Sequence, residues 1–538
     1  MRNVLSALLG IFFAVTSVTV AGCSASSGSG FGFGDGGTTG PDGTTVTTGK
    51  EGGVVLGNGD ATLLNGNDSS VVGGPCTGIQ CQQTNSATTV TGKVYDPAQV
   101  NGLYNVFVYI PNAALDPITT GPVCTACQAP ASGDPIASTS TLADGTFTLT
   151  NVPSGTNIPI VLQLGKWRRH LTLPSVAAGA TTTPADGFFR LPKKQAETSP
   201  DDNIPLIAFT TGCDGAECFF AGRIGLDQSE FTGPTGTGRV HIYKSSNDDG
   251  QTFPNGAGDA MTLWGTASEM MKYDMIFDAC ECSTFDRGGA GSTDIGYVNF
   301  LNYLNAGGRA FTTHYFYNFF ADETQCDGIG GGGGFGGSSY CYGQAALPTV
   351  GAWEGNTGKP FASDTPYCPN DENIGSGGEE LGGSCMTIDT AIPKGVAFAK
   401  WYQENNTKLT VGGGEEYGYV GLTDIREDMG PLASSLVAAG TATPWLYAGD
   451  LTSGYDAYYL SFNTPISTST TAQCGRAIFS DVHLDDAPSG QFPSYCPSDP
   501  NSSDHAPNEL ALEFLFFDLA SCVQNDTVSP PPPPPSSK

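Results

Sequence analysis

Two kinds of hydrophobic periodicity follow one another along this chain, and they constrain its fold more than any other feature. Between residues 89 and 195, short runs such as 104–110 and 146–149 alternate apolar and polar side chains and are separated by Gly, Pro and Asn. Such alternation is typical of antiparallel strands that bury one face. From 203 to 525, strand-like runs are instead separated by helix-like segments, which is typical of a mostly parallel sheet with helices on both faces.

These patterns predict a multidomain protein with an N-terminal antiparallel β-sandwich (89–195) followed by an α/β domain (203–525). A Gly-rich insertion with four cysteines is expected at 322–392, and a proline-rich, exposed tail at 526–538. In the α/β domain, strands are expected at 238–243, 273–278, 309–313, 409–411 and 476–480, and helices at 260–272, 297–305, 395–404 and 509–519. The last helix is apolar almost all round, so we expect it to be buried.

The N-terminus has the composition of an export signal. A single basic residue, Arg2, precedes a mostly apolar run over 4–20 that is too short and too interrupted to span a bilayer comfortably. The run ends in the sequence VAGC, which resembles the lipobox of bacterial lipoproteins. The resemblance implies a signal peptide over 1–22 and lipidation of Cys23, with outer-membrane rather than inner-membrane anchoring because Ser24 replaces the Asp of retained lipoproteins. The alternative is an ordinary cleaved signal with a chance cysteine.

Charge and composition limit the partners and the domain count. The net charge of −31 repels the phosphates of nucleic acid, so we expect no nucleic-acid partner. Residues 23–88 contain few aromatic residues and abundant Gly, Thr and Ser, which predicts a linker behind the lipid anchor. Within it, 57–60 is similar to calcium-binding Gly/Asp repeats, but too few copies are present for a stacked array.

The 16 cysteines suit an oxidising compartment in which disulfide bonds persist. A redox or metal site is the alternative for Cys124 and Cys127, although no second ligand pair lies nearby. Cys280 and Cys282 are also interpreted as disulfide partners. The close spacing of five pairs predicts disulfides that each staple a single loop, namely Cys76 with Cys81, Cys124 with Cys127, Cys213 with Cys218, Cys326 with Cys341, and Cys368 with Cys385.

Motifs in both predicted domains resemble known families. The sequences GKVYD at 92–96, DGTF at 144–147 and VPSG at 152–155 are similar to the carboxypeptidase regulatory-like domain, a transthyretin-like β-sandwich. The resemblance implies a structural or carbohydrate-binding-like module without catalysis of its own. A long insertion at 111–138 departs from the compact form of that family.

The second domain loosely resembles the glutamine-amidotransferase-like α/β fold. The resemblance rests on 273–278, 297–301 and 306–311, together with a closing strand from Cys474. In that family the nucleophilic cysteine follows a strand like 309–313. This chain has Thr-Thr-His-Tyr there, so glutamine hydrolysis is not supported.

Polar side chains follow the predicted strands of the α/β domain. Asp278 and Glu281 follow one strand, His314 the next, and Asp481 and His483 the last. Because ligands of open α/β sheets bind at the carboxyl ends of strands, we expect these residues at one edge. Two imidazoles with Asp481 can bind zinc and activate water, or His314 can be a general base oriented by Asp481. The alternative is that these groups only hydrogen-bond loops, since no HExxH-type motif is present.

The densest basic cluster consists of Lys166, Trp167, Arg168 and Arg169. An exposed Trp beside guanidinium groups can stack on a sugar or hold an anionic polymer. The alternative interpretation pairs these cations with acids of the neighbouring domain and buries Trp167.

Together these features favour an envelope-anchored lipoprotein with a non-catalytic binding or structural role. Its expected partners are the membrane and a polysaccharide, a cell-wall component or an envelope protein. The alternative is an extracytoplasmic hydrolase that uses the face of His314 and His483, with zinc or calcium as the cofactors to consider.

Overall fold

The structure is a computed structural model that describes residues 87–530 with interruptions, together with 46–48, 54–56, 79 and 82–83. The interruptions are 125–130, 213–214, 246–249, 282–294, 323–324, 326–340, 354–383, 407–416, 423–424, 427–428, 467, 485–489 and 501–506. The predicted signal peptide, the lipidation at Cys23, the strand at 409–411 and most of the proline-rich tail therefore lie outside the described residues.

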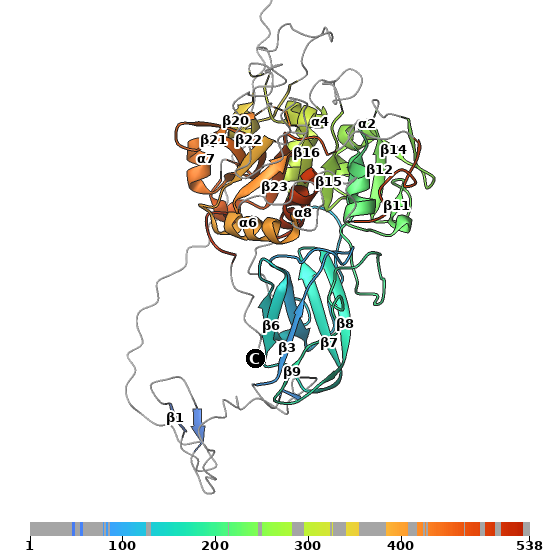
Figure 1. Ribbon diagram of the computed structural model, residues 1–538, viewed down its shortest axis with the longest axis vertical. Coiled ribbons are helices and arrows are strands. Elements are labelled where there is room, and N and C mark those ends of the chain that lie inside the picture. Colours follow the sequence, from blue (N-terminus) through green and yellow to red (C-terminus); the bar gives the residue numbers. More distant parts are fainter. Residues whose placement is uncertain are drawn as a thin grey trace, which may run out of the picture. The chain divides into compact units, whose positions relative to one another are not determined.

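The chain divides into two compact units, Met1–Pro75 and Cys76–Lys538. In the first unit, β1 (Val46–Thr48) pairs antiparallel with β2 (Val54–Leu56), within the segment that composition predicts as a linker. The second unit contains every other described element (Figure 1). It is rich in β-structure, with several sheets and few helices.

Two sheets form what we call the N-terminal β-region, residues 87–191. The first has the order β6-β3-β9 and the second the order β5-β4-β7-β8, with antiparallel pairing throughout the second. Gly145, at φ +83°, makes the turn that the DG sequence predicts before β6. The strands are β3 (Thr89–Lys93), β4 (Phe107–Pro111), β5 (Pro135–Ser140), β6 (Thr146–Thr150), β7 (Gly155–Leu164), β8 (Trp167–Val176) and β9 (Thr181–Thr182).

A sheet of 11 strands forms the centre of the second region, which we call the large-sheet region, residues 204–530. Its order is β11-β12-β10-β15-β16-β23-β22-β21-β18-β19, and β14 also pairs with β12. Pairing is parallel from β11 to β23 and antiparallel from β23 to β19. The strands are β10 (Ile207–Thr210), β11 (Phe231–Thr232), β12 (Val240–Lys244), β14 (Gly258–Asp259), β15 (Met275–Asp278), β16 (Arg309–Thr313), β18 (Ser384–Ile388), β19 (Tyr419–Leu422), β21 (Ala442–Asp450), β22 (Gly454–Thr464) and β23 (Gly475–Ser480).

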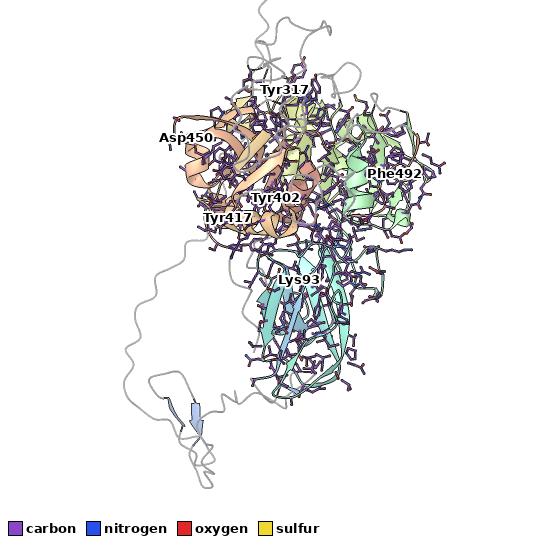
Figure 2. The ribbon with its side chains drawn as sticks, in the orientation of Figure 1. Lys93, Tyr317, Tyr402, Tyr417, Asp450 and Phe492 are labelled. Carbon is purple, nitrogen blue, oxygen red and sulfur yellow. A yellow bond between two sulfur atoms is a disulfide. The ribbon has the colours of Figure 1, made fainter. Side chains whose placement is uncertain are left out.

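Helices cover both faces of the large sheet because its strands are apolar on both sides. In β15, Ile276 joins the core on one face, and Met275 and Phe277 join the core on the other. Tyr317 and Tyr402 lie on these opposite faces (Figure 2). The first face packs against α2 (Ala260–Gly265), α3 (Ala267–Met270) and α4 (Ile295–Asn305), and the second against α6 (Pro393–Asn406) and α8 (Pro507–Ala520).

The predicted helices are present, but one of them is divided, and part of the predicted insertion is a strand. The helix expected at 260–272 is two short helices, because Thr266 has the extended backbone angles φ −126° and ψ 104°. Residues 384–388, expected to belong to the Gly-rich insertion, form a strand of the large sheet. The remaining elements are α1 (Ala216–Cys218), η2 (Phe219–Arg223), η3 (Gln228–Glu230), η4 (His314–Phe319), η5 (Leu347–Val350), α7 (Ser434–Ala439), η6 (Thr470–Ala472), β13 (Gln251–Thr252), β17 (Gly351–Trp353), β20 (Met429–Leu432) and β24 (Gly490–Gln491).

Helix α8 joins the two regions through one continuous apolar core. Its Phe516 and Phe517 contact Trp167 of β8, with ring centroids 6.5 and 5.8 Å apart. Its Phe514 stacks on Tyr104 of the N-terminal β-region at 6.0 Å. Buried side chains of both regions belong to the same hydrophobic cluster, so the two sheet systems share one core on the side that faces α8. Among the described helices, none is long and apolar enough to cross a bilayer.

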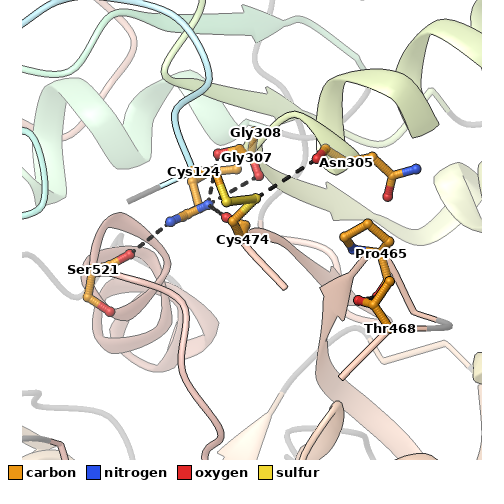
Figure 3. The surroundings of a disulfide bond; sticks show 9 residues. Cys124, Asn305, Gly307, Gly308, Pro465, Thr468, Cys474 and Ser521 are labelled. Atoms are coloured by element: carbon orange, nitrogen blue, oxygen red, sulfur yellow. Dashed lines mark hydrogen bonds between the residues drawn. A yellow bond between two sulfur atoms is a disulfide. The ribbon is translucent and has the colours of Figure 1, made fainter. Parts of the chain in front are cut away.

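Two disulfides connect distant parts of the chain, in place of two expected local staples. Cys124 bonds to Cys474, and Cys218 bonds to Cys496. The predicted bonds of Cys124 with Cys127 and of Cys213 with Cys218 are therefore wrong. The insertion that carries Cys124 reaches the start of β23, where it lies beside Gly307 and Gly308 (Figure 3). Sequence spacing does not reveal this proximity, because it arises only from tertiary packing.

The buried cysteine of the parallel sheet also differs from expectation. Cys280 is a buried thiol, so its expected disulfide with Cys282 is wrong. Cys341 and Cys522 are disulfide-bonded. The expected partner of Cys341, Cys326, lies outside the described residues.

The two remaining predicted staples have different outcomes. The disulfide expected between Cys76 and Cys81 is not confirmed and stays a prediction, because Cys81 and Cys76 both lie outside the described residues. The expectation that Cys385 belongs to a stapled loop is wrong, because Cys385 lies in β18, paired opposite Gly421 of β19 in the large sheet. The side chain of Cys385 and the whole of Cys368 lie outside the described residues, so a bond between them stays a prediction.

Candidate functional site

The five predicted site residues lie at the carboxyl edge of three adjacent parallel strands. Strands β15, β16 and β23 are neighbours, with Asp278 opposite Thr312 and Thr313 opposite Ser480. The residues that follow these strand ends therefore meet at one edge, as expected for an open α/β sheet. All are buried, namely Asp278, Glu281, His314, Asp481 and His483.

Two imidazoles and one thiol converge at this edge. His483 Nε2 lies 2.7 Å from His314 Nδ1, and Cys280 Sγ lies 3.2 Å from the same nitrogen. The three ligand atoms are all within 4.8 Å of one another. We call Cys280, His314 and His483 the edge triad. The structure thus brings together the two histidines that the sequence singled out and adds a cysteine in place of Asp481.

The backbone explains why His314 faces its neighbours. His314 is the first residue after β16 and has φ +39°, a conformation that L-residues other than Gly, Asn and Asp rarely adopt. Such a residue is held in place only by the structure around it, and strained positions of this kind cluster at functional sites. This turn is also the place where the amidotransferase-like resemblance puts the nucleophile.

His483 is held by the buried helix and by its own strand. Asn508 of α8 donates its side-chain N–H to the His483 carbonyl at 2.7 Å. The preceding Val482 forms an antiparallel bridge with Ile425. Two separate segments therefore fix the position of the His483 backbone at the end of β23.

The electrostatic environment keeps His314 neutral. Burial lowers the pKa of His314 well below its ordinary value of 6.5, and the charges of His483 and Arg426 lower that pKa further. A neutral imidazole retains a lone pair, which is the form that binds a metal ion or accepts a proton.

The edge triad fits a transition metal in donor type. In neutral His314, Nδ1 carries either one lone pair or one hydrogen. Because both His483 Nε2 and Cys280 Sγ approach this nitrogen, it can form a hydrogen bond of full strength with only one of them. A cation between the three atoms would bind all of them. Thiolate and imidazole are zinc ligands, whereas calcium takes oxygen ligands, so this set does not fit calcium. Cys280, His314 and His483 are therefore the residues that would hold zinc.

Among the described residues, the predicted carboxylates are not part of the convergent group. Asp278 accepts hydrogen bonds from Thr210 Oγ1 at 3.2 Å and Trp264 Nε1 at 3.3 Å. The backbone N–H of Asp481 donates to Tyr458 O at 2.7 Å. In the part of the chain that the structure describes, the edge triad is the one group of three that could hold a metal ion.

The basic cluster is a structural junction, not an exposed binding surface. Trp167 is 0% exposed, so the expected stacking face for a sugar is absent. Lys166 Nζ donates to Asp274 Oδ1 of the large-sheet region at 2.6 Å. Arg168 donates to the carbonyl of Asp116, and Arg169 pairs with Glu197. The burial of Trp167 and the pairing of Lys166 with Asp274 agree with the alternative interpretation, whereas Arg168 and Arg169 contact residues that precede the large-sheet region.

The chain has little detectable similarity to known proteins. No protein-family model matches it, and no curated protein matches it. One similar solved structure is a type II cohesin–X-dockerin complex from Acetivibrio cellulolyticus, an N-terminal interface mutant. The match has 17% identity, covers 24% of this chain and 79% of that chain, and has a TM-score of 0.15. A likeness at this TM-score carries no argument about function.

Proposed function

We propose that the large-sheet region binds a divalent transition-metal ion, zinc in the first place, and acts as a metal-dependent hydrolase on the cell envelope. The observation that carries this proposal is the convergence of Cys280, His314 and His483, whose ligand atoms lie within 4.8 Å of one another. Each residue follows a different strand of a parallel sheet, at the edge where such sheets bind ligands.

We propose a catalytic rather than a structural role for this metal. Structural zinc sites have four protein ligands, whereas catalytic sites have three and leave a position for water. The edge triad supplies three from the described residues. A zinc ion held by Cys280, His314 and His483 would supply an activated water, and a neighbouring carboxylate would accept its proton. Glu281 and Asp481 lie at the same edge and are the residues that we assign to this role.

The proposed location and architecture rest on the sequence. The lipobox-like segment supports an outer-membrane lipoprotein that is anchored through Cys23. The strands that follow the GKVYD and DGTF motifs support a carboxypeptidase regulatory-like β-sandwich for the N-terminal β-region. The parallel strands from β11 to β23 support an amidotransferase-like α/β arrangement for the large-sheet region. A non-catalytic role with a polysaccharide partner loses its main candidate surface, because Trp167 is buried.

Metal analysis of the full-length protein, extracted in detergent, tests the proposal. We expect about one equivalent of zinc, and loss of that zinc on Cys280→Ala, His314→Ala or His483→Ala. His170→Gln is the matched control, because this half-buried histidine of β8 pairs with Asp201 far from the triad in sequence and should leave the metal content unchanged. Protein that binds no zinc, nickel, cobalt or copper after incubation with each ion would overturn the proposal.

Hydrolysis of p-nitrophenyl acetate separates a catalytic from a structural metal. A catalytic ion should give a rate that is lost with a chelator and restored by zinc, while near-ultraviolet circular dichroism stays constant. If the metal is bound but the chelator changes only the stability, the ion is structural and the hydrolase proposal fails.

A further inference from the structure

A guanidinium group lies against the outer nitrogen of one proposed metal ligand. Arg426 Nη2 is 3.5 Å from His483 Nδ1, on the opposite side of that ring from His314. The backbone holds it there, because the Arg426 N–H donates to Asp481 O at 2.7 Å and Ile425 bridges to Val482. The charge of Arg426 is therefore attached to the same strand end that carries His483.

This contact selects one hydrogen arrangement for the two histidines. A guanidinium group only donates, so the His483 Nδ1 that faces Arg426 must present its lone pair. A neutral His483 then carries its hydrogen on Nε2, which donates to His314 Nδ1 at 2.7 Å. Hydrogen bonds are thus donated from Arg426 to His483 and from His483 to His314. The second of them occupies the same two nitrogens that would bind the metal.

Metal binding needs the reverse arrangement at His483. To coordinate through Nε2, a neutral histidine must carry its hydrogen on Nδ1, and proteins usually place a carboxylate or carbonyl oxygen there to accept it. Arg426 supplies a donor and a positive charge at that place. We propose that Arg426 is a positioning residue that opposes metal coordination by His483, so that the centre holds its metal more weakly than its three ligands alone would.

This inference rests on the proposed metal centre and predicts a gain of affinity on mutation. Arg426→Gln supplies an amide oxygen that can accept the Nδ1 hydrogen, and it removes the positive charge. We expect it to bind zinc at least about 10-fold more tightly, the scale on which outer-shell partners of metal ligands act. Arg426→Met removes the donor without supplying an acceptor and should lie in between. Arg426→Lys keeps a cationic donor and is the matched control, with an affinity within about 2-fold of the wild type.

Competition with a chromophoric chelator on the full-length protein measures these affinities. Cobalt substitution provides a second readout, because thiolate-to-cobalt absorption shows that Cys280 is a ligand in each variant, and circular dichroism verifies folding. Zinc binding by the wild type with no tighter binding by Arg426→Gln would overturn the inference and leave the metal centre standing. Zinc binding by neither protein would overturn both. Tight binding by Arg426→Gln alone would identify Arg426 as the barrier but would overturn the proposed metal binding by the wild type.

Discussion

Asp96 and Glu513 place two carboxyl groups in the same buried junction between the two regions of the molecule, where each shifts the pKa of the other. Asn101 Nδ2 and Arg223 Nε also donate to Glu513, at 2.8 and 3.1 Å. Burial and the charge of Asp96 raise the pKa of Glu513 to about 8. Glu513 therefore keeps its proton next to the carboxyl group of Asp96, which comes from the opposite end of the chain.

The proton that Glu513 keeps in the folded state should make the free energy of unfolding fall as the pH rises. In the folded state Glu513 keeps its proton up to about pH 8, whereas the unfolded chain releases it near the ordinary value of 4.5. The folded state binds more protons across that interval, so its free energy of unfolding decreases from about pH 4.5 to about pH 8 and levels off above. Glu513→Gln keeps a donor toward Asp96 without titrating. In urea unfolding, the variant should therefore gain stability relative to the wild type as the pH rises, whereas the exposed control Glu404→Gln should not.

Replacing Lys166 should lower the free energy of unfolding and leave binding unchanged. Lys166 Nζ contacts Asp274, whose side chain is 3% exposed, and it also donates to Gly121 O at 2.6 Å. Lys166→Met leaves Asp274 buried with the more distant Arg239 at 3.9 Å, so we expect a loss of about 2–3 kcal/mol. Lys272→Met is the control, because its pair with Glu269 is exposed and should contribute less than about 1 kcal/mol. Equal losses in denaturant unfolding would contradict this reading of the junction.

The Cys124–Cys474 disulfide should stabilise the folded protein by restricting the unfolded chain. It joins residues 350 positions apart, and the chain-entropy model gives about 5–6 kcal/mol for a loop of this length. We expect Cys124→Ser with Cys474→Ser to lower the free energy of unfolding by this amount. The loop closed by Cys218–Cys496 overlaps it, so each bond shortens the loop that the other closes, and removing both bonds should cost more than the sum of the two single losses. Additive losses would show that the two loops act independently.

The proposed lipid anchor predicts where two N-terminal variants will be found. Cys23→Ser should release the protein from membranes, because no acyl chain can then be attached, and membrane fractionation measures this release. Ser24→Asp should keep the protein on membranes but move it from the outer to the inner membrane. Persistent membrane association of Cys23→Ser would contradict the lipobox interpretation.

Periodicity predicted most of the strands at the centre of the large sheet and missed its antiparallel side. Runs such as 273–278 and 309–313 are short, apolar on both faces and bounded by turn residues, which makes them recognisable in sequence. Strands β21 and β22 are long, and their Tyr, Trp and Ser residues break simple alternation. The turn between Asp450 and Gly454 is the signal that would have located this hairpin.

The sequence predicted the sheet edge at which the candidate site lies, but it did not predict which residues form the set of ligands. Strand order along the chain placed His314 and His483 at strand ends, and parallel pairing brought them into contact. Cys280 was assigned to a disulfide because nearby cysteines in an oxidising compartment usually pair. The basic cluster was left between an exposed binding surface and a buried junction, because sequence does not reveal which acids, such as Asp274, lie opposite it in the fold.

Helix α8 occupies a position that governs the order of assembly. Its aromatic side chains complete the core around Trp167 in β8, yet residues 507–520 come after every strand of both sheet systems. A chain that is synthesised from its N-terminus therefore completes every strand before this helix becomes available. The N-terminal β-region must wait for the last helix before its apolar surface is covered. Transplanted alone into another protein, it would expose that surface and aggregate.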